Sequence, residues 1–394
     1  MSEGNGTGRV DEIGPERGAG RIYFPELDGL RFFAFMLVYL FHGGIESAML
    51  SPFVGRAVAA ALREKGWVGV ELFFILSGYL ITTLLLREED EFGRIDLQAF
   101  WIRRILRIWP LYYLTVAIGF LLIPWVEGTI GTPGYRELLA NHLAPFLGFL
   151  GNWSMSLIGP VPYDALSVLW SVCVEEQFYL FVPLLVAWVG RRYRLGLVVV
   201  LILATVLARY FFSQAYPVEI KIRFNTFMHL DTLLSGVLLA LVFGPTPGSE
   251  RGARWARWLQ WPLLLGTIWL FAGPQLGVET TERRTWDFVW IWVWGVALVA
   301  IVVSSRGWLR ASLAYSRFVW LGKISYGLYM YHEVAIWGRR SLEHRLPWFP
   351  NKDALLTIAT FAATVGLAAL SYYAFERRFL ALKRFWTRVP SRPV

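Results

Sequence analysis

The chain of 394 residues contains repeated apolar segments, which are separated by short basic ones. A helix that crosses a bilayer needs about 20 mostly apolar residues, and each segment is close to that length. Charged residues make up 17% of the chain, less than the quarter or so that is typical of soluble domains. We therefore predict an all-α, polytopic membrane protein. Ten candidate spans are predicted, at residues 31–50, 66–86, 105–124, 168–189, 195–213, 227–244, 258–276, 287–304, 318–338 and 354–375.

The chain is predicted to form one membrane domain, over residues 23–385. The Gly-rich and charged residues 1–22 predict a disordered cytoplasmic tail, and residues 386–394 predict a basic C-terminal tail. Residues 143–158 are apolar but interrupted by glycine and asparagine, which predicts an interfacial or re-entrant segment. When the loops are assigned alternately to the two sides, about two thirds of the 38 lysines and arginines fall on one side. The positive-inside rule then predicts that both termini are cytoplasmic.

The net charge of +9 does not predict a nucleic-acid-binding protein. The basic residues lie between apolar spans, where orientation in the membrane accounts for them. Because Cys173 is the only cysteine, an internal disulfide is excluded.

The first span carries two polar residues at a separation that is informative. The stretch "RFFAFMLVYLFH" begins with Arg31 and ends with His42. On an α-helix, eleven residues make about three turns, so the two side chains share one face about 16 Å apart. This spacing predicts two sites that are separated by most of a helix.

Ionisable side chains inside spans are costly in a bilayer, so each marks a candidate functional position. On the predicted topology, acidic and imidazole groups from five helices lie in the outer half of the membrane: His42, Glu71, Glu175, Glu176, His229, Asp231, His332 and Glu333. A second group gathers at the cytoplasmic mouth: Arg31, Arg103, Arg104 and Arg107.

The two groups favour two different kinds of chemistry. Arginine clusters suit phosphates, because a guanidinium binds phosphate oxygens bidentately. A histidine beside a carboxylate suits general-base catalysis. A cosubstrate with phosphates at one end and a reactive group at the end of a long arm satisfies both sites. Acyl-coenzyme A is such a molecule, and a hydroxyl acceptor would approach from the opposite side.

The chain resembles the acyltransferase-3 family of integral-membrane O-acyltransferases from about Tyr23 to Phe385. Arg31 and His42 match the Arg/Lys–ten residues–His signature of that family. The segments that carry the resemblance are "ELDGLRFFAFMLVYLFH", "GVELFFILSGYLIT", "FWIRRILRIWPLYY", "LWSVCVEEQFYLF", "FMHLDTLLSGVLLA", "LGKISYGLYMYH" and "FERRFLALKRF". The resemblance implies ten core helices, an acyl-CoA donor and acylation of a carbohydrate or glycosylated acceptor.

Further positions match the family's motifs residue by residue. Arg104 and Arg107 match its Arg-x-x-Arg motif, and Glu175 matches the acidic position of its Ser-x-Glu-x-x-Phe-Tyr motif. Cys173 departs from the family where this last motif usually has serine. We expect His42 to remove the hydroxyl proton, with Glu175 orienting it. Arg31, Arg104 and Arg107 are expected to hold the donor's phosphates.

Three other polar residues, Glu71, Asp231 and His332, each have alternative assignments that stay open. Glu71 either lines the space between the outer acidic and imidazole groups or is an interfacial charge. Asp231 is favoured over the nearby His229 for lining the substrate site. His332 is an acid/base on the acceptor side or a structural residue. The four histidines besides His42 share no His-x-x-x-His spacing, so no metal site is predicted.

The leading hypothesis is an acyltransferase of the bacterial cytoplasmic membrane. It moves an acetyl or other short acyl group from acyl-CoA to a sugar hydroxyl of a cell-envelope glycan or a glycosylated small molecule. The alternative is a transporter or flippase for a lipid-linked or anionic solute, since carriers also use intramembrane carboxylates and histidines.

Overall fold

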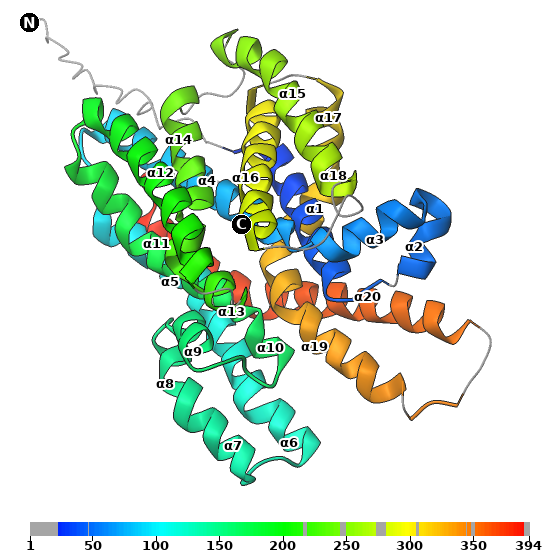
Figure 1. Cartoon of the computed structure of the whole chain (residues 1–394). Helices are drawn as coiled ribbons and strands as arrows, with labels where there is room; N and C mark the ends of the chain where they lie inside the picture. Colours follow the sequence, from blue (N-terminus) through cyan, green and yellow to red (C-terminus); the bar gives the residue numbers. More distant parts are fainter. Residues whose placement is uncertain are drawn as a thin grey trace, which may run out of the picture.

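The computed structural model describes a helical protein, and no strand occurs in the part of the chain that it describes (Figure 1). The described residues are 23–45, 47–215, 219–244, 250–272, 281–304, 307–343, 345–347 and 351–389. The predicted disordered tail, residues 1–22, and the end of the basic tail, residues 390–394, lie outside them.

Each of the ten predicted spans overlaps one long helix. These helices are α1 (Pro25–Phe41), α4 (Val68–Phe92), α5 (Leu97–Ala117), α11 (Leu169–Trp188), α12 (Arg191–Ala215), α14 (Leu230–Phe243), α15 (Glu250–Ala272), α16 (Thr281–Ser304), α19 (Ser325–Glu343) and α20 (Lys352–Ser371). Short helices connect or extend them: α2 (Ser47–Val54), α3 (Arg56–Lys65), α6 (Ile123–Glu127), α7 (Pro133–Leu138), α8 (Ala144–Leu147), α9 (Gly151–Leu157), α10 (Asp164–Ser167), α13 (Glu219–Arg223), α17 (Trp308–Leu313), α18 (Ser316–Lys323) and α21 (Arg377–Leu382).

Among the described residues, seven helical segments are long and apolar enough to cross a membrane. They are Val68–Phe92, Leu97–Glu127, Asp164–Trp188, Arg191–Ala215, Thr226–Phe243, Asp287–Ser304 and Lys352–Trp386. The chain is therefore a multi-pass membrane protein. The predicted count of about ten spans is not confirmed, because α1, α15 and α19 do not meet the same criteria. Helix α1 has only 17 residues, and α19 carries several charged side chains.

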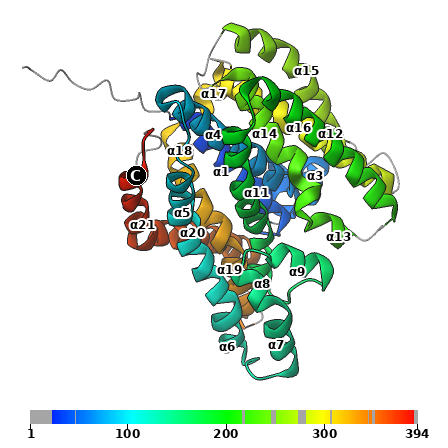
Figure 2. The same cartoon turned by 90° about the vertical axis from the view of Figure 1, so that its left-hand side faces the viewer.

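Segment 143–158 does not form a helix long enough to span a bilayer. It folds into the four residues of α8 and the seven residues of α9. Phe149 lies between the two helices with a φ of 56°, a conformation that breaks the helix. Figures 1 and 2 show α6 and α7 projecting from one end of the molecule, near these short helices, whereas α15 and α17 lie at the other end.

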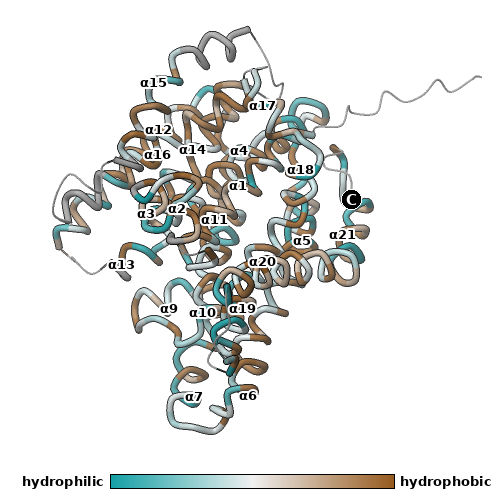
Figure 3. Tube along the Cα trace, turned by 90° about the vertical axis from the view of Figure 1, so that its right-hand side faces the viewer, coloured by the Kyte–Doolittle hydropathy of each residue, from teal (hydrophilic) through white to brown (hydrophobic). Residues whose placement is uncertain are grey.

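The centre of the fold is α4, because 83% of an apolar stretch of 18 residues in this helix is buried inside the protein. In α12, only 22% of such an apolar stretch is buried. The large apolar side chains of α12 include the exposed Leu203 and Leu207. Figure 3 shows apolar residues along α12, α14 and α16. In a membrane protein, such outward apolar faces meet lipid, while the polar groups are gathered inside.

Helices α4 and α14 approach so closely that their backbones touch at two glycines. A Cβ on Gly78 would lie 2.1 Å from the carbonyl oxygen of Leu233. A Cβ on Gly236 would lie 2.2 Å from the carbonyl oxygen of Ile75 and 2.4 Å from the amide nitrogen of Tyr79. Small residues allow this kind of close approach between membrane helices. It brings the polar residues at the start of α14 against α4.

We expect Gly236→Ala to lower the midpoint of thermal unfolding in detergent. The added methyl group would meet backbone atoms of α4, which cannot turn aside as a side chain can, and overpacking of this kind costs about 1–3 kcal/mol. Fluorescence-detected size-exclusion chromatography after heating measures the midpoint. The control is Gly366→Ala, at a helical glycine with open space around it, which should leave the midpoint unchanged or slightly higher. Equal midpoints for Gly236→Ala and the wild type would contradict this packing.

Candidate active site

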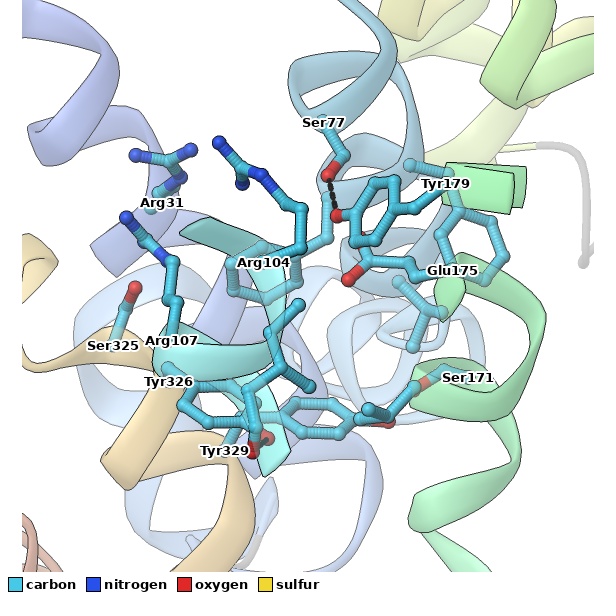
Figure 4. Close-up of a pocket in the computed structure, with 15 residues that line it drawn as sticks. Arg31, Ser77, Arg104, Arg107, Ser171, Glu175, Tyr179, Ser325, Tyr326 and Tyr329 are labelled. Atoms are coloured by element: carbon cyan, nitrogen blue, oxygen red, sulfur yellow. Dashed lines mark hydrogen bonds between the residues drawn. The ribbon is translucent and has the colours of Figure 1, made fainter. Parts of the chain in front are cut away.

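Three arginines from two helices line one pocket. Arg31 comes from α1, and Arg104 and Arg107 come from α5. Their guanidinium groups lie along one side of the pocket, while Glu175 and Tyr179 of α11 lie on the other side (Figure 4). The structure thus brings together the three arginines that the sequence assigned to phosphate binding.

Local sequence explains why the arginines of α5 point the same way. The side chain of Asp96 caps α5 by accepting a hydrogen bond from the amide of Ala99 at 2.9 Å, which starts the helix at a defined residue. Residues three apart lie on the same helix face, so Arg104 and Arg107 both reach the pocket. Arg103 points elsewhere, because it binds the buried carboxylate of Glu88 at 3.2 Å.

The pocket arginines retain capacity for an anion. Arg31 makes an ion pair with Asp28 at 3.1 Å. The guanidinium of Arg104 lies over the rings of Phe100 and Tyr179, 5.7 and 5.6 Å from their centroids. Its buried Nε has no hydrogen-bond partner among the described residues. A buried donor without a partner is costly, and an anion bound here would remove that cost.

A second cavity adjoins the first and shares its three arginines and Ser77. It extends instead toward the start of α1, at Tyr23 and Asp28, and along α4 to Leu84. The arginines therefore stand between two cavities. A ligand with an anionic centre could extend on both sides of them.

His42 lies at the other end of α1, where it caps the helix. Its Nδ1 is 3.2 Å from Nε2 of His332 and 3.7 Å from a carboxylate oxygen of Glu333. His332 and Glu333 are almost fully buried, and the His42 side chain is 21% exposed. Helix α19 thus supplies both neighbours of His42.

Hydrogen bonds to backbone carbonyls determine which imidazole nitrogens carry protons. Nδ1 of His332 is 2.6 Å from the carbonyl oxygen of Tyr329, so it carries the proton and donates it. Its Nε2 then offers a lone pair in the neutral ring. Nδ1 of His42 lies between that lone pair and the carbonyl oxygen of Val38, at 3.1 Å. Both neighbours accept, so neutral His42 carries its proton on Nδ1 and keeps the lone pair on Nε2.

Tyr329 connects the two sites. Its ring lines the arginine pocket, and its ring centroid is 5.6 Å from that of His332. Its hydroxyl donates to the carbonyl of Val168 at 3.1 Å and lies 2.7 Å from that of Ser171. Tyr329 therefore lies between the arginine pocket and His332.

The structure corrects the expected position of Glu175. The predicted topology placed this carboxylate in one layer with His42, but it lies in the arginine pocket. In the described chain, the carboxylate within ion-pair distance of His42 is Glu333. Glu176, which diverges from Glu175 on the helix, accepts a hydrogen bond from the indole of Trp109 at 2.9 Å.

Glu71 and Asp231 make partnerships of their own. Glu71 binds His229 Nδ1 and the hydroxyl of Thr232, each at 2.8 Å. Asp231 binds the buried guanidinium of Arg209 at 2.6 Å. Within the described residues, no hydrogen bond or ion pair joins either carboxylate to His42, although the sequence placed all three in one group in the outer half of the membrane. Buried charges in a bilayer need partners, and these pairs tie α14 to α4 and α12.

Cys173 and Tyr179 occupy the first and last positions of the motif that contains Glu175, and Ser77 lies in α4. Cys173 is buried, with its sulfur 3.3 Å from the hydroxyl of Tyr112. Ser77 and Tyr179 share a short hydrogen bond at the pocket wall (Figure 4). Both belong to segments quoted for the resemblance, but only the fold shows that they meet.

We expect Asp231→Asn to lower the thermal unfolding midpoint, because it leaves the Arg209 guanidinium buried beside a neutral partner. Removing one member of a buried ion pair costs about 3–5 kcal/mol, whereas replacing both with apolar residues is often neutral. The double variant Arg209→Met/Asp231→Leu should therefore recover most of the lost stability in the same heating assay. A stable Asp231→Asn protein without activity would instead support the substrate-binding role.

Comparisons of the sequence with known proteins identify a family. The family model Acyl_transf_3, described as an acyltransferase domain, matches residues 24–373. The peptidoglycan O-acetyltransferase OatA of Listeria monocytogenes is 26% identical over 372 residues, which cover 90% of this chain and 56% of the relative. The O-acetyltransferase OatA of Staphylococcus aureus (strain NCTC 8325 / PS 47) is 30% identical over 237 residues, which cover 57% of this chain and 35% of the relative.

A further Staphylococcus aureus (strain COL) protein, whose naming as an O-acetyltransferase is provisional, is 28% identical over 373 residues, which cover 91% of this chain and 57% of that protein. The chain thus spans little more than half the length of the curated relatives that it matches most extensively. No solved structure gives a significant match.

Proposed function

Because this chain belongs to the Acyl_transf_3 family of acyltransferases, we propose that it is a membrane-bound O-acyltransferase. It moves an acetyl or other short acyl group from acyl-CoA, which enters from the cytoplasm, to a sugar hydroxyl. One observation carries the proposal: α1 holds Arg31 in an anion-binding pocket and His42 in a base site at its opposite end. The pocket has the chemistry for the donor's phosphates, and the histidine has the free lone pair that proton removal needs.

The donor would bind with its phosphates against Arg31, Arg104 and Arg107. A guanidinium offers paired N–H donors to phosphate oxygens, and the unpartnered Nε of Arg104 adds one more. The pantetheine arm would then pass beside Tyr329 and bring the thioester to His42. The separation of about 16 Å along α1 is of the order of the length of that arm. Metal chemistry has no part in this proposal.

The position of the proton on neutral His42 determines which nitrogen acts as the base in acyl transfer. Its Nε2 takes the proton of the sugar hydroxyl while the oxygen attacks the thioester carbonyl carbon. The tetrahedral intermediate collapses, the carbon–sulfur bond breaks, and the Nε2 proton passes to the departing thiolate. The products are the O-acyl sugar and free CoA thiol. During the reaction, Nδ1–H keeps its acceptor His332, and the Glu333 carboxylate 3.7 Å away stabilises the transient imidazolium.

The acceptor would be a cell-envelope glycan or a glycosylated small molecule. The names of the relatives support acetyl as the group transferred, and that of the Listeria protein supports a glycan acceptor. Glu175 would act within the arginine pocket, where it faces the donor instead of orienting His42. We assign a supporting role in the site to Glu71, Asp231 and His332. His332 would act through its contact with His42.

The protein would lie in a bacterial cytoplasmic membrane, with about ten spans and both termini in the cytoplasm. The distribution of lysine and arginine supports this orientation. The test uses a Cys173→Ser background with one new cysteine, Ser2→Cys or Ser391→Cys. We expect a membrane-impermeant maleimide to label both positions only after the cells are opened. Labelling of either position in intact cells would contradict the proposed orientation.

Activity tests the proposal directly. Purified protein with acetyl-CoA and a glycan extract should release free thiol and form an O-acetyl ester without an ion gradient. His42→Gln should lower kcat by about 10²–10⁴-fold, the usual contribution of a general base. Arg104→Lys should raise KM for the donor roughly tenfold or more, because a charge-assisted hydrogen bond contributes about 1.5–3 kcal/mol.

The matched control for the arginine is Arg103→Lys. This neighbour is paired with Glu88 outside the pocket, and lysine retains that pair, so KM should stay near the wild-type value. Donor binding is followed in parallel by calorimetry, because a missing acceptor would also give a zero rate. If acetyl-CoA and longer acyl-CoAs neither bind nor react, the acyltransferase proposal fails. Gradient-driven uptake of a chemically unchanged solute would then establish the transporter alternative.

A further inference from the structure

The geometry around His42 points to a divalent metal site: we infer that His42, His332 and Glu333 together bind Zn²⁺. The ligand atoms would be Nδ1 of His42, Nε2 of His332 and a carboxylate oxygen of Glu333. Two imidazoles and one carboxylate are a known ligand set for zinc, with a fourth position left open. The binding itself does not depend on the proposed acyl transfer.

The three atoms already form a triangle of the size that zinc needs. The distances are 3.2 Å between the two nitrogens, and 3.7 and 3.9 Å from Glu333 to His42 and His332. Ligands about 2.0–2.1 Å from a tetrahedral zinc are separated from one another by about 3.4 Å. The metal could therefore be coordinated after shifts of a few tenths of an ångström. All three groups lie within 4.8 Å of one another.

The surroundings resemble those of a metal centre in two further respects. Nδ1–H of His332 donates to the carbonyl of Tyr329, and metal-binding histidines usually donate their other N–H in this way, which orients the ring. The second carboxylate oxygen of Glu333 is buried without a hydrogen-bond partner in the described chain. Buried polar atoms normally have partners, so this oxygen is consistent with a site built for a ligand.

The cluster adjoins the surface at His42, whose side chain is 21% exposed. The spacing of histidines along the sequence could not reveal the site. His42 and His332 are 290 residues apart and meet only because the end of α1 packs against α19. His-x-x-x-His patterns detect ligands on one helix, and this ligand set comes from two.

Metal binding would stop His42 from acting as a base, a consequence that rests on the proposed function. Zinc on Nδ1 displaces the proton from that nitrogen, and the neutral ring then carries its proton on Nε2. No lone pair remains to accept a proton from the sugar hydroxyl. Zinc should therefore inhibit acyl transfer, and removal of zinc by a chelator should restore it.

Binding is measured on the full-length chain in detergent, freed of any histidine tag. Titration calorimetry with ZnCl₂ should give one zinc per chain, and Co²⁺ in its place should give the visible absorption of a four-coordinate site. Glu333→Gln should weaken binding at least tenfold, and His332→Ala should abolish the cobalt spectrum. His142→Ala is the control, because this buried histidine hydrogen-bonds to Ser154 instead, and it should bind zinc like the wild type.

The outcomes separate the two proposals. Absence of stoichiometric binding in the wild type, or binding that Glu333→Gln and His332→Ala leave unchanged, would overturn the metal site. Size-exclusion profiles of the variants exclude loss of folding as the cause of lost binding.

Inhibition by zinc is measured from the formation of the O-acetyl ester, because the free thiol product also binds zinc. A protein that binds zinc at these residues but never transfers an acyl group contradicts only the proposed function, and full activity at saturating zinc contradicts the inhibitory consequence.

Discussion

Backbone contacts at three glycines determine the position of α1, and both candidate sites depend on that helix. A Cβ on Gly29 would lie 2.0 Å from the carbonyl oxygen of Leu313, and one on Gly322 would lie 1.8 Å from that of Asp28. On the other side, a Cβ on Gly69 would lie 2.2 Å from the carbonyl of Ala34. Helix α1 is therefore held between α4, α17 and α18 with no side chain between the backbones. Its two polar ends are thereby fixed relative to each other and to their neighbours.

Some charged side chains inside the protein join helices, and others face a cavity or the surface. The Arg209–Asp231 and Glu71–His229 pairs fasten α14 to its neighbours, so they satisfy the requirement that buried charge be compensated. Arg104 in the pocket and Glu333 beside His42 each keep a buried polar atom without a partner among the described residues, as do Arg209 and Asp231. Such atoms are costly unless a ligand satisfies them. Arg104 lines a cavity and His42, beside Glu333, is partly exposed, whereas Arg209 and Asp231 are almost fully buried. A ligand could therefore satisfy the free atoms of the candidate sites but not those of this structural pair.

The depth of each polar residue in the membrane, estimated from its place in a predicted span, was a useful guide. It did not identify which residues contact one another. It placed Glu175 in the same layer as His42, whereas α11 directs this carboxylate toward the arginines. Glu333 was placed in that layer without a role of its own, yet it is the carboxylate next to His42. The rotation of each helix about its own axis decides such contacts. A single sequence restrains that rotation weakly when a helix is apolar on most sides, as α4 and α11 are.

The sequence by itself determined the helical membrane class, the segments that become the long helices, and the shared face of the Arg-x-x-Arg pair. These features follow from apolar length and from the 3.6-residue repeat, both of which are local. It also identified α1 as the helix that separates an arginine from a histidine. Only the tertiary structure decided that His332 and Glu333 meet His42, and that Glu71 and Asp231 have other partners. These contacts join residues more than a hundred positions apart, or from different helices, and they depend on how closely glycine-lined helices approach.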